Sequence, residues 1–151
     1  MPKIDTTTWS EHAGGIHPVF GLDNGAYSDL PLGDVVGLSQ FGVHLERLPP
    51  GSRSSFRHWH EAEDEFIYII SGELVLIEDH EVLLKAGDAA GWKAGQPIAH
   101  CLENRSDSDA VLLVVGARAE RDVVHYPDHD VKLLRSETGR TFTRSDGKPV
   151  E

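Results

Sequence analysis

The feature that most constrains the fold of this chain is a series of short, strand-like segments separated by glycine, with no long stretch of helical periodicity. Glycine supplies the permissive backbone that tight turns need, and short apolar or alternating segments between turns are typical of strands. The expected strands are 54–60, 65–71, 73–79, 81–85, 89–92, 98–104 and 110–117, preceded by one that runs from about residue 38 to a turn at 48–52. This pattern predicts an all-β fold, either a sandwich or a barrel.

Residues 58–72, HWHEAEDEFIYIISG, combine this pattern with side chains that bind metals. Alternate side chains of an extended strand face the same way, so His58 and His60 share a face. A turn can follow, after which Glu65 opens an apolar strand and can return beside the two imidazoles. His100, in a later strand-like segment, is a fourth candidate. Three imidazoles and one carboxylate are suitable ligands for Fe(II), Mn(II), Zn(II), Ni(II) or Cu(II), although an isolated His-x-His pair on a surface strand is more often simply solvated.

The spacing of these residues and of the surrounding glycines resembles the two motifs of the cupin family, G(X)5HXH(X)3,4E(X)6G and G(X)5PXG(X)2H(X)3N. The residues that follow these motifs in order are Gly51, His58, His60, Glu65 and Gly72, and then Gly87, Gly95, His100 and Asn104. Six residues rather than five separate Gly51 from His58, Lys93 stands at the proline position, and four residues rather than two separate Gly95 from His100. These departures change loop length and turn chemistry but remove no ligand.

The resemblance covers roughly residues 38–118 and implies a double-stranded β-helix, a jelly-roll barrel with its site in the mouth. It implies metal ligands at His58, His60, Glu65 and His100. We expect one divalent transition metal per chain, with Fe, Mn, Zn and Ni not distinguished. The chain is expected to form one domain, with an irregular, Gly- and Pro-rich N-terminal arm over 1–37, the cupin barrel over 38–118, and a short C-terminal extension over 119–151 packed on the same domain.

Cupins include dioxygenases, isomerases, decarboxylases, lyases and non-catalytic sensors, so the resemblance does not fix a reaction. The leading hypothesis is a metal-dependent enzyme of isomerase, dioxygenase or lyase type that acts on a small polar or carbonyl-bearing metabolite. The alternative is a non-catalytic sensor module for a small ligand or a metal, so whether the chain is an enzyme stays open. Candidates for an additional acid or base are His44, Glu46, Arg57 and Tyr68, and the parity of Tyr68 predicts that it faces away from the metal.

The composition of the chain limits the classes of partner that it can bind. The net charge of −11 opposes binding to a polyanion, so we expect a small-molecule ligand in the barrel and no nucleic acid. The first residues lack an apolar signal core and no segment approaches about eighteen consecutive apolar residues, which predicts a cytoplasmic protein without membrane contact. The single cysteine, Cys101, cannot form an internal disulfide and is interpreted as a small buried residue rather than a reactive thiol.

Residues 66–70 and 111–115 are apolar at successive positions, which implies that both faces of the sheet are covered. One face lines the barrel, and the other needs a second subunit, the N-terminal arm, or both. We predict a homodimer in which Phe66 and Tyr68 lie at or near the covered face, with Trp9 and Phe20 of the arm as competing cover.

Two further polar groups are interpreted as solvated. His125, Asp128, His129 and Asp130 are residue types that suit a metal, but Pro127 interrupts the strand. The loop that contains Glu61, Glu63 and Asp64 is expected to be an acidic, solvated loop near the mouth. After residue 116 we expect one additional edge strand, and a turn at 145–149.

Overall fold

The computed structural model describes residues 3–150 and shows an all-β protein, as predicted. Within these residues the only helical elements are two 3-10 turns, η1 (Asp34–Val36) and η2 (Pro127–His129). Neither is long or apolar enough to cross a membrane.

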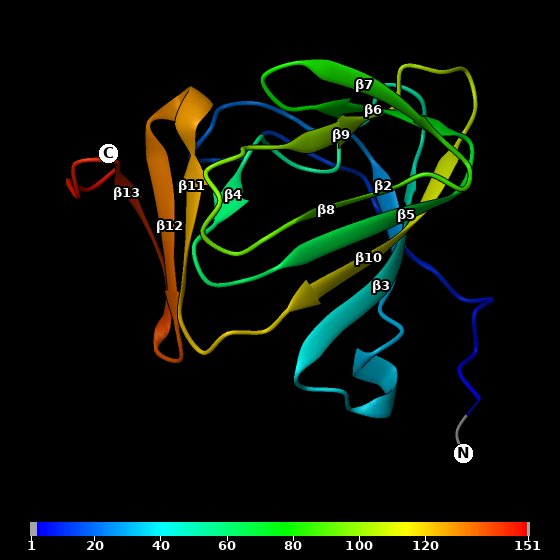
Figure 1. Ribbon diagram of the computed structural model, residues 1–151, viewed down its shortest axis with the longest axis horizontal. Coiled ribbons are helices and arrows are strands. Elements are labelled where there is room, and N and C mark those ends of the chain that lie inside the picture. The colour runs from blue at the N-terminus through cyan, green and yellow to red at the C-terminus, as the bar shows by residue number, and fades with distance from the viewer. Residues whose placement is uncertain (1–2, 151) are drawn as a thin grey trace.

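Residues 3–150 form three antiparallel sheets (Figure 1). The largest is six-stranded, in the order β1 (Ser10–His12), β2 (Tyr27–Leu30), β3 (Phe41–Leu48), β10 (Ala110–Ala117), β5 (Glu65–Ser71) and β8 (Ala89–Trp92). A three-stranded sheet of β7 (Glu81–Lys85), β6 (Glu73–Ile77) and β9 (Cys101–Glu103) lies at the top of the view. The third sheet contains β13 (Gly139–Arg144), β12 (Val131–Ser136), β11 (Asp122–Tyr126) and β4 (Trp59–His60).

Alternation along β5 explains why the barrel is apolar inside. Ile67 and Ile69 are buried, and the register pairs them with Val114 and Leu112 of β10. The alternate side chains Phe66, Tyr68 and Ile70 are exposed on the opposite face. The buried core joins the six-stranded sheet to the three-stranded sheet. Its members are Leu48, Ile67, Ile69, Leu74, Leu76, Leu84, Trp92, Leu102, Ala110 and Leu112.

Gly72 shows why a glycine ends the first motif. It joins β5 to β6 with φ +76°, a left-handed conformation that disfavours residues with a Cβ atom. A Cβ atom at this position would lie 2.6 Å from the carbonyl oxygen of Asp109 and 2.9 Å from the Cα of Ala110. The turn therefore packs its backbone directly on the start of β10.

The strand predicted over 54–60 is shorter than expected, because regular pairing is confined to β4. A hydroxyl replaces part of the ladder: the Ser54 N–H donates to the Leu102 carbonyl at 2.8 Å, but Leu102 returns its N–H to Ser54 Oγ at 2.9 Å. Further along, His58 and His100 exchange both backbone hydrogen bonds, at 3.1 and 3.0 Å. The extended course of the chain is thus kept up to the two histidines.

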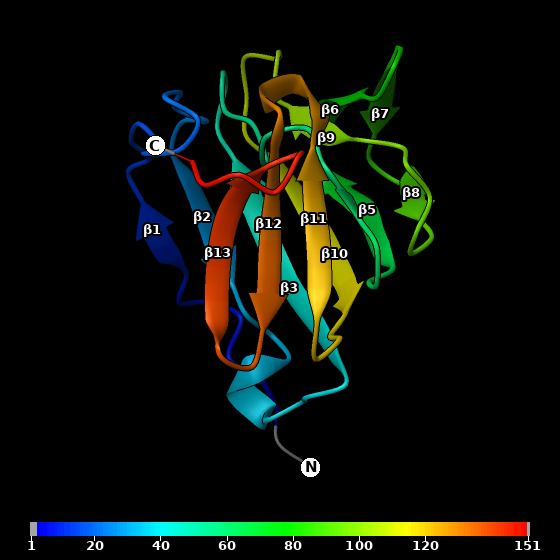
Figure 2. The same ribbon diagram turned by 90° about the vertical axis from the view of Figure 1, so that its left-hand side faces the viewer.

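The C-terminal extension is more regular than predicted. In place of one edge strand it forms β11, β12 and β13 (Figure 2), and the register pairs β11 with β4. Pro127 ends β11, as expected, and η2 carries the chain into β12. The β11–β4 pairing sets Val124 opposite His60, so the extension lies directly against the histidine strand.

The N-terminal arm is largely irregular but contributes β1 and β2 to the edge of the six-stranded sheet. Phe20 of the arm packs on Phe56 and Tyr126, with ring centroids 4.2 and 4.9 Å apart. Trp9 lies over the Arg47 guanidinium at 4.2 Å. The division of the chain into arm, barrel and extension at residues 37 and 118 stays a prediction.

Candidate metal centre

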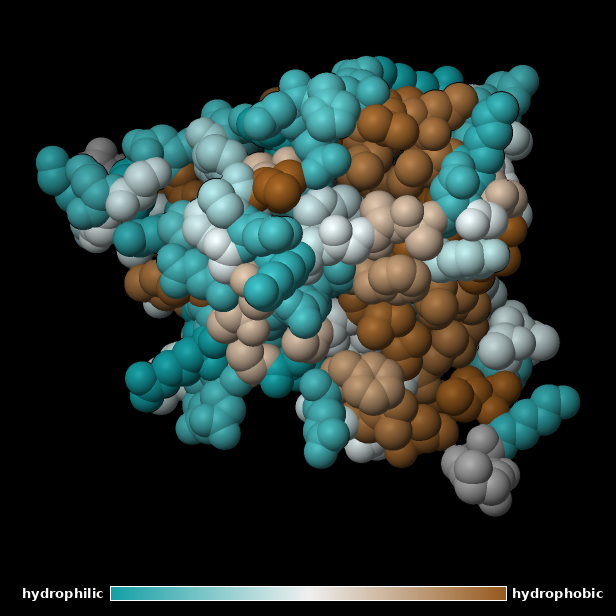
Figure 3. Space-filling model, viewed as in Figure 1, coloured by the Kyte–Doolittle hydropathy of each residue, from teal (hydrophilic) through white to brown (hydrophobic). Residues whose placement is uncertain are grey.

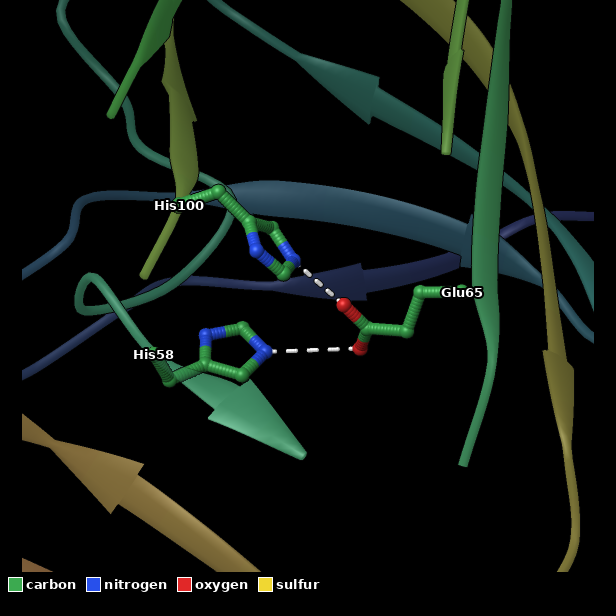
Figure 4. Close-up of side chains that lie close together, drawn as sticks. All are labelled: His58, Glu65 and His100. Atoms are coloured by element: carbon green, nitrogen blue, oxygen red, sulfur yellow. Dashed lines mark hydrogen bonds and ion pairs between the residues drawn. The ribbon is translucent and has the colours of Figure 1, made fainter. Parts of the chain in front are cut away.

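Three imidazoles converge on one carboxylate inside the barrel. Glu65 is the first residue of β5. Its Oε1 atom lies 3.3 Å from Nε2 of His58 and 2.8 Å from Nε2 of His60. Its Oε2 atom contacts Nε2 of His100. Figure 4 shows His58 and His100 approaching the two oxygens of Glu65 from separate segments. The four predicted ligand side chains therefore lie together; their role as ligands stays a prediction.

The opposite nitrogen of each imidazole also faces an oxygen. Nδ1 lies 2.8 Å from the Phe56 carbonyl in His58 and 3.0 Å from the Ile98 carbonyl in His100. A carbonyl oxygen only accepts, so both Nδ1 atoms donate, and Nε2 is the nitrogen left with a lone pair in a neutral ring. A metal-binding histidine usually has this arrangement, in which an oxygen fixes the ring that presents its other nitrogen to the metal. The donor set therefore fits a divalent cation.

The electrostatics of the group are dominated by mutual attraction. Burial raises the pKa of Glu65, but hydrogen bonds from His100, His58 and His60 outweigh it and hold that pKa well below its usual range. Burial likewise lowers the pKa of His60, but Glu65 and Asp122 outweigh it and raise the pKa to about 9. This field of acidic oxygens favours positive charge at the centre of the cluster.

His58, Glu65 and His100 line one wall of a cavity of about 110 Å³. The cavity has an apolar part, to which Ile67, Leu112 and Val114 contribute. Trp92 stacks on the His100 imidazole, with centroids 3.7 Å apart and planes 4° from parallel, and so fixes the orientation of that ring.

Two of the predicted acid or base candidates also line this cavity. His44 and Glu46 project inward from β3, where they pair in register with Val114 and Leu112. Nε2 of His44 lies 3.3 Å from the Glu46 carboxylate, whose side chain is 13% exposed. The other two candidates lie elsewhere. Tyr68 is exposed on the outer face, as its parity predicted, and Arg57 binds the carboxylates of Asp79 and Asp128.

Sequence reasoning missed the residues behind His60. Asp122 of β11 is buried and contacts His60 Nδ1 at 2.5 Å through Oδ2. Glu63 was predicted to be solvated; that prediction is wrong, because it is 8% exposed and its carboxylate contacts Arg135 at 2.5 Å. An ion pair with a residue far along the chain leaves no local signal in sequence. Asp64 likewise accepts a hydrogen bond from the Ala94 N–H at 2.7 Å.

The 125–130 segment forms no cluster of potential ligands within residues 3–150. Asp128 contacts Arg57 at 2.7 Å, and His125 contacts Glu61 at 2.8 Å. Cys101 is buried, and burial raises the pKa of its thiol, which disfavours the reactive thiolate.

Comparison with known proteins agrees with this architecture. Residues 44–116 match the family described as the Cupin domain. The crystal structure of a sugar phosphate isomerase of the cupin superfamily from Silicibacter pomeroyi is 41% identical, with a TM-score of 0.90 over 99% of this chain and 97% of that chain. A provisionally named sugar phosphate isomerase from Acidithiobacillus ferrooxidans is 31% identical, with a TM-score of 0.78 over 83% and 81% of the two chains.

A predicted oxalate decarboxylase from Thermotoga maritima is 30% identical, with a TM-score of 0.55 over 63% of this chain and 83% of that chain. No curated protein matches the chain. The fold is a double-stranded β-helix, and the chain belongs to the cupin superfamily. Since its relatives carry names for different reactions, the residues of the site must decide what this member does.

Proposed function

We propose that the chain is a metal-dependent isomerase of a small hydroxy-carbonyl metabolite, with one divalent metal held by His58, His60, Glu65 and His100. The observation that supports it most is the convergence of the three imidazoles on Glu65, beside a cavity that is also lined by the His44–Glu46 pair. The similarity to two structures named as sugar phosphate isomerases makes sugar phosphates the first substrates to test.

A divalent cation held by His58, His60, Glu65 and His100 would act as a Lewis acid toward the carbonyl oxygen of the substrate. The residues of this chain supply the proton transfer. Glu46 takes the proton from the hydroxyl-bearing carbon beside the carbonyl and returns it to the former carbonyl carbon, while the hydroxyl proton passes to the other oxygen. His44 holds the Glu46 carboxylate in place. The product has the same atoms and electrons as the substrate, so no oxidant or second reactant is needed.

The size of the cavity limits what binds inside it. Its volume of about 110 Å³ is well below the ~300 Å³ at the lower end for small-ligand pockets, so only the reacting end of a sugar fits. The described residues that line it include no Lys or Arg. A phosphate group would therefore be bound outside the cavity, and the reaction itself should not require one.

The test uses the full chain loaded in turn with Mn(II), Fe(II), Zn(II) and Ni(II), with phosphorylated and unphosphorylated aldoses and ketoses in deuterated water. We expect metal-dependent interconversion with solvent deuterium in the product, and a loss of turnover of about 10²–10⁴-fold in Glu46→Gln with metal content unchanged. The matched control is Glu81→Gln, which removes an exposed partner of Arg105. Binding without conversion for every compound would favour the sensor module, and full activity in Glu46→Gln would exclude it as the base.

We also propose that the chain forms a homodimer through the outer face of the six-stranded sheet. Phe66 and Tyr68 are exposed there, and the register continues their rows through Val115 and Leu113 of β10. Figure 3 shows the resulting apolar area over this part of the molecule. Phe20 of the arm does not cover it, because this ring packs on Phe56 and Tyr126 instead. An apolar face of this kind normally marks an interface.

Light scattering at micromolar concentration tests the dimer. We expect twice the chain mass of 16.6 kDa for the wild type and a monomer for Tyr68→Glu. Leu134→Glu, at an exposed apolar residue of β12, is the control and should stay dimeric. A wild-type monomer would refute the proposal. The predicted cytoplasmic location stays a prediction.

A further inference from the structure

The three histidines of the candidate metal centre differ in what holds their Nδ1 atoms. Backbone carbonyls hold His58 and His100, but a carboxylate holds His60: Oδ2 of Asp122 lies 2.5 Å from its Nδ1. A carboxylate only accepts when ionised, so it fixes the same ring tautomer as a carbonyl does. It also brings a full negative charge behind the ring, which makes the imidazole a stronger donor to a cation.

The surroundings of Asp122 hold its carboxylate in one orientation. The side chain is fully buried, and Oδ1 accepts hydrogen bonds from the backbone N–H groups of Ala62 and Val123, both at 2.9 Å. A guanidinium nitrogen of Arg135 lies 3.8 Å from Oδ2 and 2.5 Å from the buried Glu63.

Asp122 and Arg135 belong to β11 and β12, outside the segment 44–116 that matches the cupin domain. They reach the site because β11 pairs with β4, with Val124 opposite His60. The C-terminal extension thus forms the rear wall of the candidate metal centre. The contact joins residues 62 positions apart, so no local sequence pattern predicts it.

We propose that Asp122 is a positioning residue that holds His60 in the tautomer with a proton on Nδ1 and thereby sets the affinity of the site for its metal. The inference rests on the metal ligands of the proposed function. The backbone N–H groups of Ala62 and Val123, with Arg135 beside them, hold the Asp122 carboxylate in place. Loss of a carboxylate behind a metal-binding histidine typically lowers metal affinity about 10–100-fold.

A purely structural role for Asp122, as an acceptor for two backbone N–H groups, makes a different prediction. Asp122→Asn keeps an oxygen for those two groups and turns its NH2 group toward His60. Nδ1 must then accept, which moves the ring proton to Nε2 and blocks the ligand nitrogen. Turning the amide over would set NH2 against two N–H donors, so that orientation is disfavoured. Asp122→Ala removes the acceptor but presents no donor to the ring.

The experiment compares Zn(II) and Co(II) affinity, measured by calorimetry on the full chain, with the thermal stability of the same metal-free variants. We expect Asp122→Asn to bind metal about 10–100-fold more weakly than wild type and more weakly than Asp122→Ala, although Asp122→Ala is the less stable variant. The matched control is Asp29→Asn, which alters another carboxylate–imidazole contact, with His12 at 2.8 Å, on β2. It should leave metal affinity unchanged.

Wild-type affinity in Asp122→Asn would overturn the inference, as would a greater loss in Asp122→Ala than in Asp122→Asn. If Asp122→Ala does not fold, the comparison of Asp122→Asn with Asp29→Asn still decides, since equal affinities in these two variants contradict the proposal. A wild-type chain that binds neither metal would overturn the proposed ligand set itself, an outcome distinct from the failure of Asp122 alone.

Discussion

Two segments of this chain contain the same kinds of side chain, but only one forms a cluster. Residues 58–65 carry two histidines and acidic residues, and so do residues 125–130. In the first segment, His58 and His60 alternate along extended chain and Glu65 begins the next strand, so all three meet. In the second segment, Pro127 ends β11 and opens a 3-10 turn.

The turn sends the side chains of the second segment to three different neighbours. His125 stacks on Trp59 with centroids 4.2 Å apart, Asp128 binds Arg57, and His129 packs on Phe20. The comparison teaches that residue type alone does not define a metal site. Strand parity, together with a partner strand that returns a carboxylate, brings donor atoms to one point.

The largest effect is expected when a histidine of the candidate metal centre is removed, compared with removal of a histidine from residues 125–130. His100→Ala should lower metal affinity by more than the ~10–100-fold typical for loss of a supporting partner, because it removes a proposed ligand itself. His129→Ala should leave the affinity unchanged. Elemental analysis after dialysis, with calorimetry, measures both, and equal losses in the two variants would show that the second segment also contributes to the site.

A smaller effect is expected at Asp128. Asp128→Asn should lower the free energy of unfolding by about 1 kcal/mol or less, since the carboxylate is 45% exposed and Arg57 keeps Asp79 as a partner. Metal affinity should not change. Urea denaturation at pH 7 gives the first quantity, and a large drop in metal affinity would mean that this segment supports the site.

The contribution of the Arg57–Asp128 ion pair to the free energy of unfolding depends on pH. Hydrogen bonds from Arg57 hold the pKa of Asp128 below its ordinary value of 3.8. A carboxyl group whose pKa is lowered by folding stabilises the folded chain above its unfolded pKa, and this stabilisation disappears as the pH falls through the folded pKa. The stability difference between wild type and Asp128→Asn should therefore be constant near neutral pH and shrink below about pH 3.8. A difference that grows in acid would contradict this assignment.

The smallest effect is expected at His125. His125→Gln should change the free energy of unfolding by no more than about 0.5 kcal/mol, because the ring and its partner Glu61 lie at the surface. The stack on Trp59 is the contact it would lose. Denaturation curves with unchanged slope would check this value, and a cost of several kcal/mol would mean that the stack holds β11 on β4.

Much of the fold could be predicted from local pattern. The bounds of β5, β7, β8 and β10 agree with those expected, because glycines and alternating apolar residues mark them directly. The predicted strand at 54–60 was too long, since the Ser54 hydroxyl takes the place of a backbone partner. Only one strand was predicted in the extension, where the structure has three. Their short runs of apolar residues form a sheet only by pairing with each other and with β4, which no local pattern indicates.

The residues of the candidate site also fall into those that the sequence predicts and those that depend on strand pairing. His58 and His60 follow from strand parity, whereas His100 was found through the spacing of a family motif. The inward direction of His44 and Glu46 depends on the register of β3 with β10, which no local pattern specifies. Asp122 could not be predicted for the same reason, because its contact with His60 exists only after β11 pairs with β4.

The stacking of Trp92 on His100 gives the protein an optical property. The chain has three tryptophans, and the other two lie over Arg47 and beside His125. An indole in van der Waals contact with a metal-bound imidazole loses its fluorescence when the ion has a partly filled d shell, through electron or energy transfer, whereas Zn(II) has a filled shell and leaves the emission largely intact. The emission of Trp92 should therefore distinguish Cu(II) or Ni(II) from Zn(II) in the wild-type protein, and Trp92→Phe should reduce the difference.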